Sequence, residues 1–237
     1  MNLIKEIAKM IDHSILHPTF TDDDLIKNCE IAKKYNVATV CVKPYHTKMA
    51  SEILNESEVS ICAVIGFPHG NSSVEIKKKE TLQVIQDGAT EVDMVINIGK
   101  VLQKDWNYIN HELLEINSIC IENGAILKVI FETDFITDDE LKIKLCQLCS
   151  NNNIAFVKTS TGYGYVKGND GQYNYAGATD HDLILMRKYC DPNVQIKAAG
   201  GVRDLDRILE VKALGVTRVG ATATVAIMEE AIRKFKE

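Results

Sequence analysis

The chain has 237 residues, of which 46% are hydrophobic and 25% are charged, and its 27 basic and 33 acidic side chains leave a formal net charge of −6 at pH 7. A chain of this length can bury a full apolar core without disulfides or metals. Because the balance is acidic and both signs are interspersed, we expect neither nucleic acid nor an anionic membrane as a partner. We expect a single domain over residues 1–237.

The seven cysteines form an odd and scattered set. This pattern is typical of reduced thiols that pack as small hydrophobic side chains in a cytoplasmic protein. Cys146 and Cys149 form a lone C-x-x-C pair in a helical pattern, so we interpret them as packing residues. Residues 1–6 carry charges where a signal peptide would be apolar, and no apolar run approaches membrane-spanning length. The sequence therefore predicts a soluble cytoplasmic protein.

Short apolar runs alternate with amphipathic stretches along the chain. We expect strands at residues 13–16, 38–42, 60–65, 91–95, 127–131, 154–158, 194–197 and 218–219. Helical periodicity covers the stretches between them, at residues 22–34, 73–87, 106–122, 138–149, 180–190, 203–213 and 223–235. Thr21 and Thr137 each precede a run of acidic residues, which predicts that they cap helix N-termini.

Eight strands with intervening helices indicate parallel β–α units, and that number in one domain fits a (β/α)8 TIM barrel. The first strand is the weakest of the eight, so a six-stranded doubly wound sheet is the alternative fold. The longest irregular stretch runs from Gly162 to Gly177. Loops of this length are usually functional or mobile, and this one directly follows the strand at residues 154–158.

Four ionisable residues lie in consecutive strands: Asp93, Lys128, Lys158 and Lys197. In a barrel the chemistry gathers at the C-terminal ends of the strands, and consecutive strands are neighbours. A single strand lysine is most often a surface residue whose ammonium reaches water. Three lysines and one aspartate on adjacent strands instead favour a functional site.

Lys158 closes an apolar run and precedes a polar segment, so burial is expected to lower its pKa. A free lysine has a pKa of about 10.4, whereas a working amine nucleophile needs about 7–8. Desolvation and a second ammonium, that of Lys197, can supply this shift. Asp93 would then balance part of the charge and relay a proton through a water molecule.

Glycines follow the last two strands, at Gly200, Gly201 and Gly220. Glycine lets backbone N–H groups approach an anion closely, and a phosphate site after strands seven and eight is common in barrels. Simple tight turns are the alternative interpretation. His13 and His17 lie four residues apart, but a strand would not bring them together as a helix would, so we predict no metal site.

The chain resembles the deoxyribose-phosphate aldolase family nearly from end to end. The most specific segments are Phe156-Val157-Lys158-Thr159-Ser160-Thr161-Gly162 and Lys197-Ala198-Ala199-Gly200-Gly201-Val202-Arg203. Supporting segments cover residues 11–16, 64–70, 91–95 and 127–133. The resemblance implies a class I aldolase that reversibly cleaves 2-deoxy-D-ribose 5-phosphate to acetaldehyde and D-glyceraldehyde 3-phosphate, without a cofactor.

The resemblance also implies roles for particular residues. Lys158 would form the Schiff base, Lys197 would be the cation that lowers its pKa, and Asp93 would relay protons with support from Lys128. The sugar phosphate would bind against Gly162, Gly200, Gly201, Gly220 and Thr222. A homo-oligomer is possible, although the sequence does not define one.

Three features depart from the family pattern. Ala223 stands where consecutive serines usually follow the last strand, so one hydroxyl near the phosphate is lost. The loop at residues 163–175 is longer than usual, and His17 replaces an expected asparagine or lysine. These departures keep three alternatives open: a related Schiff-base aldolase for another aldehyde or sugar, a metal-dependent aldolase, and a non-catalytic sugar-phosphate binding protein on the same scaffold.

Overall fold

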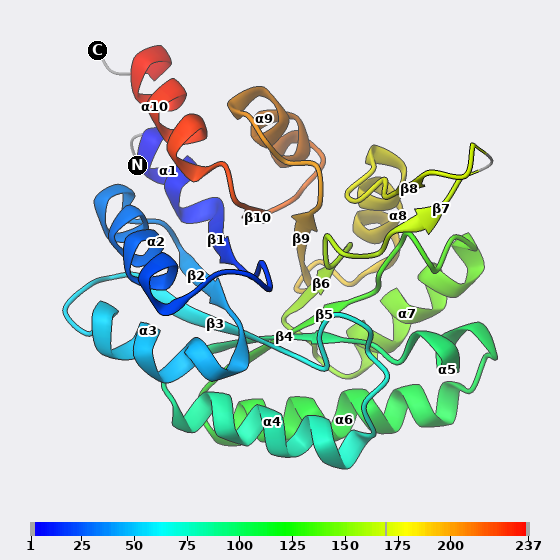
Figure 1. Cartoon of the computed structure of the whole chain (residues 1–237). Coiled ribbons are helices and arrows are strands. Elements are labelled where there is room, and N and C mark those ends of the chain that lie inside the picture. Colours follow the sequence, from blue (N-terminus) through cyan, green and yellow to red (C-terminus); the bar gives the residue numbers. More distant parts are fainter. Residues whose placement is uncertain (1–2, 169, 236–237) are drawn as a thin grey trace.

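The computed structural model describes residues 3–168 and 170–235, and in this part of the chain eight parallel strands close into a barrel (Figure 1). Around the ring the strands follow the order β1, β10, β9, β6, β5, β4, β3, β2. Their bounds are β1 Ile11–Ile15, β2 Thr39–Val42, β3 Ser60–Ile65, β4 Glu91–Val95, β5 Ile126–Ile130, β6 Phe156–Lys158, β9 Gln195–Ala199 and β10 Arg218–Ala221. The predicted (β/α)8 barrel is confirmed.

Closure of the ring excludes the doubly wound alternative. The first strand pairs with the last one, Ile11 lying opposite Val219 and His13 opposite Ala221. Strand β1 also begins at Ile11, two residues before the predicted start. Because of this difference Asp12 belongs to the barrel wall.

Helices surround the barrel in Figure 1. They are α1 Leu3–Met10, α2 Asp22–Tyr35, α3 Thr47–Leu54, α4 Val74–Gln86, α5 Ile98–Leu102, α6 Trp106–Glu122, α7 Asp139–Asn151, α8 Asp180–Tyr189, α9 Leu205–Ala213 and α10 Thr224–Phe235, with the 3-10 turn η1 at Pro44–His46. Helices α1, α3 and α5 were not predicted, because two turns or fewer give little periodicity.

The two predicted helix caps have different outcomes. The Thr21 side chain accepts a hydrogen bond from the Asp24 N–H at the start of α2, as predicted. The prediction for Thr137 was wrong, because Asp138 caps α7 and accepts from the Glu140 N–H. An aspartate is an equally good cap, and its carboxylate also interacts with the helix dipole.

The main core fills the space between the barrel strands and the helices. It includes Leu113 and Ile116 of α6, which are fully buried against the sheet. Burial of each such side chain stabilises the fold by about 1.5–3 kcal/mol. Cys146 and Cys149 are buried free thiols in this core, which agrees with their interpretation as packing residues. Among residues 3–168 and 170–235, no helix combines the length and apolar character needed to cross a bilayer.

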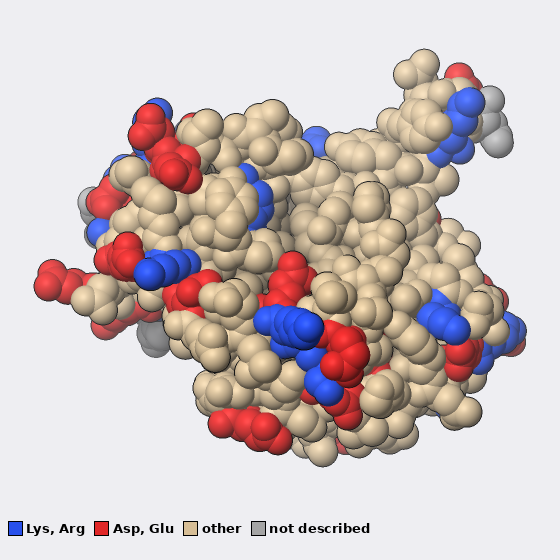
Figure 2. All heavy atoms as spheres, turned by 60° about the horizontal axis from the view of Figure 1, so that its bottom comes forward, with Lys and Arg blue, Asp and Glu red and all other residues tan. Residues whose placement is uncertain are grey.

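The stretch from Gly162 to Gly177 is not irregular throughout, as the sequence suggested. It contains a hairpin in which β7 (Val166–Lys167) pairs antiparallel with β8 (Tyr173–Asn174). The Gly168 carbonyl accepts from the Gly171 N–H in the turn. The hairpin stands away from the barrel in Figures 1 and 2. Figure 2 also shows basic and acidic side chains intermixed on this face, consistent with the interspersed charges of the sequence.

Candidate active site

Lys158 and Lys197 lie side by side in the barrel interior. Strands β6 and β9 are adjacent and pair these two residues directly. Lys158 Nζ donates to Asp93 Oδ2 at 2.7 Å, and Lys197 Nζ donates to the same oxygen at 2.8 Å. Asp93 and Lys197 are fully buried and Lys158 is 2% exposed. The structure therefore brings the predicted lysine pair together around one carboxylate oxygen.

Lys128 contacts the other oxygen of Asp93. The two residues are paired between β4 and β5, and Lys128 Nζ lies 2.8 Å from Asp93 Oδ1. Lys128 also lies 2.7 Å from Glu91 Oε2. All four predicted ionisable residues thus belong to one buried network.

Sequence reasoning missed further members of this network. Asp12 forms ion pairs with Lys197 and with Arg218, whose Nη1 lies 2.6 Å from Asp12 Oδ1. Arg218 Nη1 also lies 3.0 Å from Glu91 Oε2. Asp12 could have been found if the first strand had been started at Ile11, since barrel interiors face alternate residues of a strand.

Cys62 is a further neighbour that the sequence did not single out. Its Sγ lies 3.0 Å from Lys128 Nζ, and the thiol donates to Asp93 Oδ1 at 3.1 Å. Burial raises the pKa of Cys62 well above its ordinary value, so the thiol stays protonated at neutral pH. It therefore acts as a hydrogen-bond donor to Asp93.

The network holds its charges apart from bulk water. Burial favours the neutral form of Asp93, but Lys128, Lys158 and Lys197 outweigh it and hold the pKa of Asp93 well below its usual range. Burial likewise opposes the charge on Lys197, yet Asp12 and Asp93 raise the pKa of Lys197 above its ordinary value. Asp93 is therefore a carboxylate and Lys197 an ammonium at neutral pH.

The fully ionised network has an excess of positive charge. Among the described residues it contains four cations, Lys128, Lys158, Lys197 and Arg218, and three carboxylates, Asp12, Glu91 and Asp93. Removing one proton from a lysine would balance these charges. An unbalanced charge inside a protein is costly.

A cavity of about 450 Å³ opens above Lys158. It is lined by all five predicted phosphate-site residues, together with the lysine itself and His17: Lys158, Gly162, Gly200, Gly201, Gly220, Thr222 and His17. Lys158 is the lysine of the network that lines it. Ala223, the position that departs from the family pattern, directly follows Thr222 and is half-buried.

Glu132 shapes the rim of this region. It lies just after β5, and both of its carboxylate oxygens accept from the Thr161 N–H at 3.3 Å. Burial raises the pKa of Glu132. A Cβ at Gly164 would lie 2.8 Å from this carboxyl group, so the chain passes close by only because Gly164 lacks a side chain. Glu132 thus positions the segment that follows Lys158.

Two groups of possible metal ligands overlap the network. They are Cys41, Cys62 and Asp93, and Asp12, Cys62 and Glu91. The ammonium group of Lys128 already lies within 3.6 Å of side-chain atoms in both groups. A metal ion there would have to displace or repel that ammonium, so this donor set fits a lysine better than a metal.

The profile of the "DeoC/LacD family aldolase" matches residues 6–226. The chain belongs to this family. It is 45% identical over 230 residues to the deoxyribose-phosphate aldolase of Rhodopirellula baltica, which covers 97% of this chain and 91% of that protein. It is 41% identical to the enzyme of the same name from Thermococcus kodakarensis, over 96% of this chain and 97% of that one.

A solved structure shows the same relationship for this DeoC/LacD aldolase. The tetrameric deoxyribose phosphate aldolase from Aeropyrum pernix superposes with a TM-score of 0.85 at 25% identity, covering 96% of this chain and 92% of that one. The resemblance drawn from the sequence is confirmed. The protein is accordingly an enzyme, a carbon–carbon lyase.

The geometry suits the chemistry of this aldolase. A buried amine at the floor of a cavity can attack a carbonyl carbon where water is scarce. The neighbouring ammonium of Lys197 and the carboxylate of Asp93 can stabilise charge and pass protons beside it. Backbone N–H groups near glycines at the opposite wall can bind an anionic group.

Proposed function

We propose that this single-domain aldolase reversibly cleaves 2-deoxy-D-ribose 5-phosphate to acetaldehyde and D-glyceraldehyde 3-phosphate through a Schiff base at Lys158. The observation that carries the proposal is the contact of Lys158 and Lys197 with the same oxygen of Asp93, directly beneath the cavity. The names of the relatives from R. baltica and T. kodakarensis support the substrate.

The excess positive charge of the network supports Lys158 as the nucleophile. Lys128 contacts three carboxylates, and Lys197 contacts two. Lys158 has an ion pair with Asp93 alone among the described residues, and it shares that carboxylate with two other cations. Lys158 is therefore the cation whose proton is held least firmly, and it is the one that meets a substrate in the cavity.

The bond changes follow from amine chemistry. The Lys158 amine adds to the C1 aldehyde of the open-chain sugar, and water leaves to give an iminium ion. The C3 hydroxyl then loses its proton, the C2–C3 bond breaks, and its electron pair forms an enamine as D-glyceraldehyde 3-phosphate departs. The enamine takes a proton at C2. Water finally hydrolyses the iminium ion to acetaldehyde and the free amine.

Asp93 and the two other lysines serve the proton transfers. Three ammonium groups hold the pKa of Asp93 well below its usual range, so this carboxylate alone is a weak base. We assign it the role of passing a proton between water and the neighbouring amines. Lys197 supplies a fixed positive charge beside Lys158, and Lys128 holds Asp93 in place.

The distal end of the cavity would bind the phosphate. Gly162, Gly200, Gly201 and Gly220 line it with backbone close to the surface, and Thr222 adds a side-chain hydroxyl. Glycine permits close approach of backbone N–H groups to an anion. Remote binding of this kind fixes the sugar so that its aldehyde lies near the lysine.

Borohydride reduction in the presence of acetaldehyde tests the Schiff base. Intact mass should show a two-carbon adduct on the wild-type protein, and peptide mapping should place it on Lys158. The variant Lys158→Arg should remain unmodified. If no adduct forms, or if it maps to another lysine, the proposed mechanism is wrong.

The rate of cleavage of 2-deoxy-D-ribose 5-phosphate tests the substrate. A related aldolase with another aldehyde or sugar is the second candidate, and the hairpin beside the cavity and the alanine at position 223 favour it. Formation of the acetaldehyde adduct without cleavage of the phosphorylated sugar would support that second candidate.

Assembly and location belong to the proposal as well. We propose a homo-oligomer, on the strength of the tetrameric relative from A. pernix, and light scattering on the purified protein tests it. A cytoplasmic location stays a prediction. It is supported by the seven buried free cysteines, a state typical of reducing compartments.

A further inference from the structure

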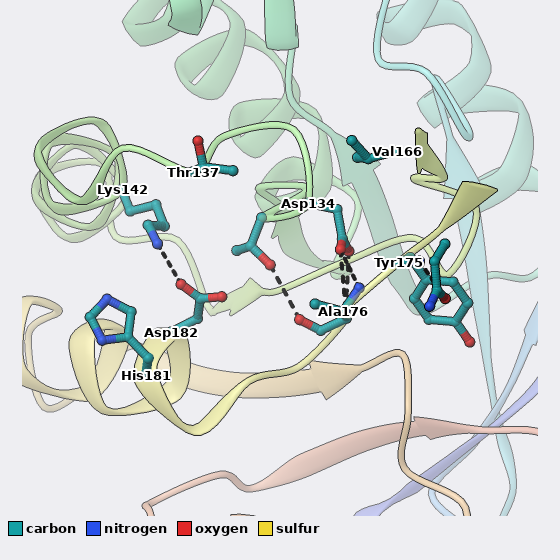
Figure 3. Close-up of a pocket in the computed structure, with 11 residues that line it drawn as sticks. Asp134, Thr137, Lys142, Val166, Tyr175, Ala176, His181 and Asp182 are labelled. Atoms are coloured by element: carbon teal, nitrogen blue, oxygen red, sulfur yellow. Dashed lines mark hydrogen bonds and ion pairs between the residues drawn. The ribbon is translucent and has the colours of Figure 1, made fainter. Parts of the chain in front are cut away.

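Tyr175 forms a wall between two cavities. It lines the cavity above Lys158, and it also lines a second cavity of about 500 Å³ beneath the β7–β8 hairpin. Figure 3 shows this second cavity with Tyr175 at one end and Lys142, His181 and Asp182 at the other. The hairpin is the inserted segment of the sequence, so Tyr175 brings a side chain to the active site that the usual short loop would not supply.

The ring of Tyr175 packs directly on the glycine segment after β9. A Cβ placed on Gly200 would lie 3.3 Å from Cε2 of Tyr175, so the ring lies in van der Waals contact with that backbone. The ring of Tyr165 packs edge-on against Tyr175, with centroids 5.3 Å apart and an interplanar angle of 84°. Tyr175 is therefore supported on both sides.

The backbone after Tyr175 is fastened to the same glycine segment. Gly177 has a φ of +67°, and a Cβ there would lie 2.7 Å from the Gly200 carbonyl oxygen. That oxygen accepts from the Ala178 N–H at 3.0 Å. Asp134 holds the other side, since its carboxylate accepts from the N–H groups of Ala176 and Gly177, as Figure 3 shows. The base of the hairpin and the Gly200 turn are thus fixed to each other.

The hydroxyl of Tyr175 lies at the charged corner of the cavity. Arg203 Nη2 donates to Tyr175 Oη at 3.5 Å, and both residues line the cavity that contains Lys158. Because the guanidinium occupies a lone pair of the phenol oxygen, the phenol proton is free to be donated elsewhere. A phenol O–H and a guanidinium beside exposed glycine backbone form a set of donors suited to a phosphate dianion.

We propose that Tyr175 is a specificity-determining residue that makes this aldolase select sugars ending in a phosphate. The inference rests on the proposed function. It also accounts for Ala223: the hairpin delivers a hydroxyl to the phosphate end from the opposite side of the cavity, where the turn after β10 lacks one.

Binding of glycerol 3-phosphate tests this role without requiring turnover. Titration calorimetry would compare the wild-type protein with Tyr175→Phe, which removes only the hydroxyl. Loss of a hydrogen bond to a charged group should raise the Kd by about tenfold. Tyr173→Phe is the matched control, because Tyr173 lies on the same hairpin and is 65% exposed, and its Kd should equal that of the wild type. An equal Kd for Tyr175→Phe and the wild type would overturn the proposal.

Turnover gives a second and independent measurement. The ratio of kcat/KM for 2-deoxy-D-ribose 5-phosphate to that for 2-deoxy-D-ribose should fall by about tenfold in Tyr175→Phe, mainly through KM for the phosphorylated sugar. An unchanged ratio would count against Tyr175. If the wild type cleaves neither sugar but Tyr175→Phe still weakens glycerol 3-phosphate binding, the proposed reaction fails while the role of Tyr175 stands.

Discussion

Lys197 lies directly opposite Lys158 across the β6–β9 pair, and the ammonium groups of both residues contact one oxygen of Asp93. Two cations on one carboxylate oxygen are held together only because Asp12 supplies a second anion to Lys197. The charge on Lys197 is thereby fixed. The proton on Lys158 competes for a carboxylate that is already neutralised.

Replacing Lys197 with methionine should lower kcat for aldol cleavage by at least about a hundredfold, the lower range for a group that assists proton transfer. With Lys197 gone, Asp93 holds the proton on Lys158 more firmly, so borohydride trapping with acetaldehyde at pH 7 should also slow. Both rates would be measured on protein shown by circular dichroism to be folded.

Lys79→Met is the control for this variant, because it removes an exposed lysine of α4. Its rates should match those of the wild type. Turnover by Lys197→Met at the wild-type rate would show that the second ammonium has no part in the reaction.

Asp12→Asn should make the unfolding free energy less dependent on pH in acid. Burial alone would raise the pKa of Asp12, but Lys197, Lys128 and Arg218 lower it below the value of an unfolded aspartate. The stability that Asp12 contributes is therefore present above about pH 4 and lost as the pH falls towards its folded pKa. The slope of free energy against pH should decrease by up to about 1.4 kcal/mol per pH unit.

Urea unfolding between roughly pH 3 and pH 5 checks this slope. Asp23→Asn, which changes an exposed aspartate of α2, should keep the wild-type slope. Identical slopes for Asp12→Asn and the wild type would mean that Asp12 gains no stabilisation from its cations.

Lys77→Met should destabilise the fold by about 3–5 kcal/mol, because it leaves a buried carboxylate without its partner. Lys77 Nζ lies 2.7 Å from Glu112 Oε1, and both side chains are fully buried between α4 and α6. Glu112 also accepts from the Asn97 N–H at 3.0 Å, just after β4. Burial raises the pKa of Glu112, which is consistent with a carboxylate that depends on its lysine.

The double variant Lys77→Met, Glu112→Leu separates charge from packing. It removes both charges, so its unfolding free energy should lie closer to that of the wild type than the single variant does. Urea titrations of the three proteins give the comparison. A double variant less stable than Lys77→Met would show that the ion pair does more than satisfy its own charges.

Ala223→Ser should strengthen binding of the phosphorylated sugar. The position lies in the turn after β10, beside Thr222 of the cavity wall. An added hydroxyl that donates to a phosphate oxygen should lower KM by up to about tenfold. Initial-rate kinetics would be compared with Ala226→Ser on the exposed side of α10. If KM does not fall, the missing hydroxyl is not what limits phosphate binding here.

Much of the fold was readable from local pattern. Apolar runs of a few residues alternating with amphipathic stretches require parallel strands covered by helices, and eight of them require closure. The same pattern placed Asp93, Lys128, Lys158 and Lys197 in adjacent strands. Order along the chain determines adjacency around a barrel, so a local pattern was sufficient.

Tertiary structure alone decided the charge balance and the shape of the cavity. Arg218 and Asp12 are 206 residues apart, and only closure of the ring brings them into contact. The inserted segment carries weak strand signals, so its hairpin and the contact of Tyr175 with Gly200 could not be read from its residues. Sequence determines which strands are neighbours; register and closure in three dimensions determine which side-chain atoms meet, because those contacts are set by distances that local pattern does not contain.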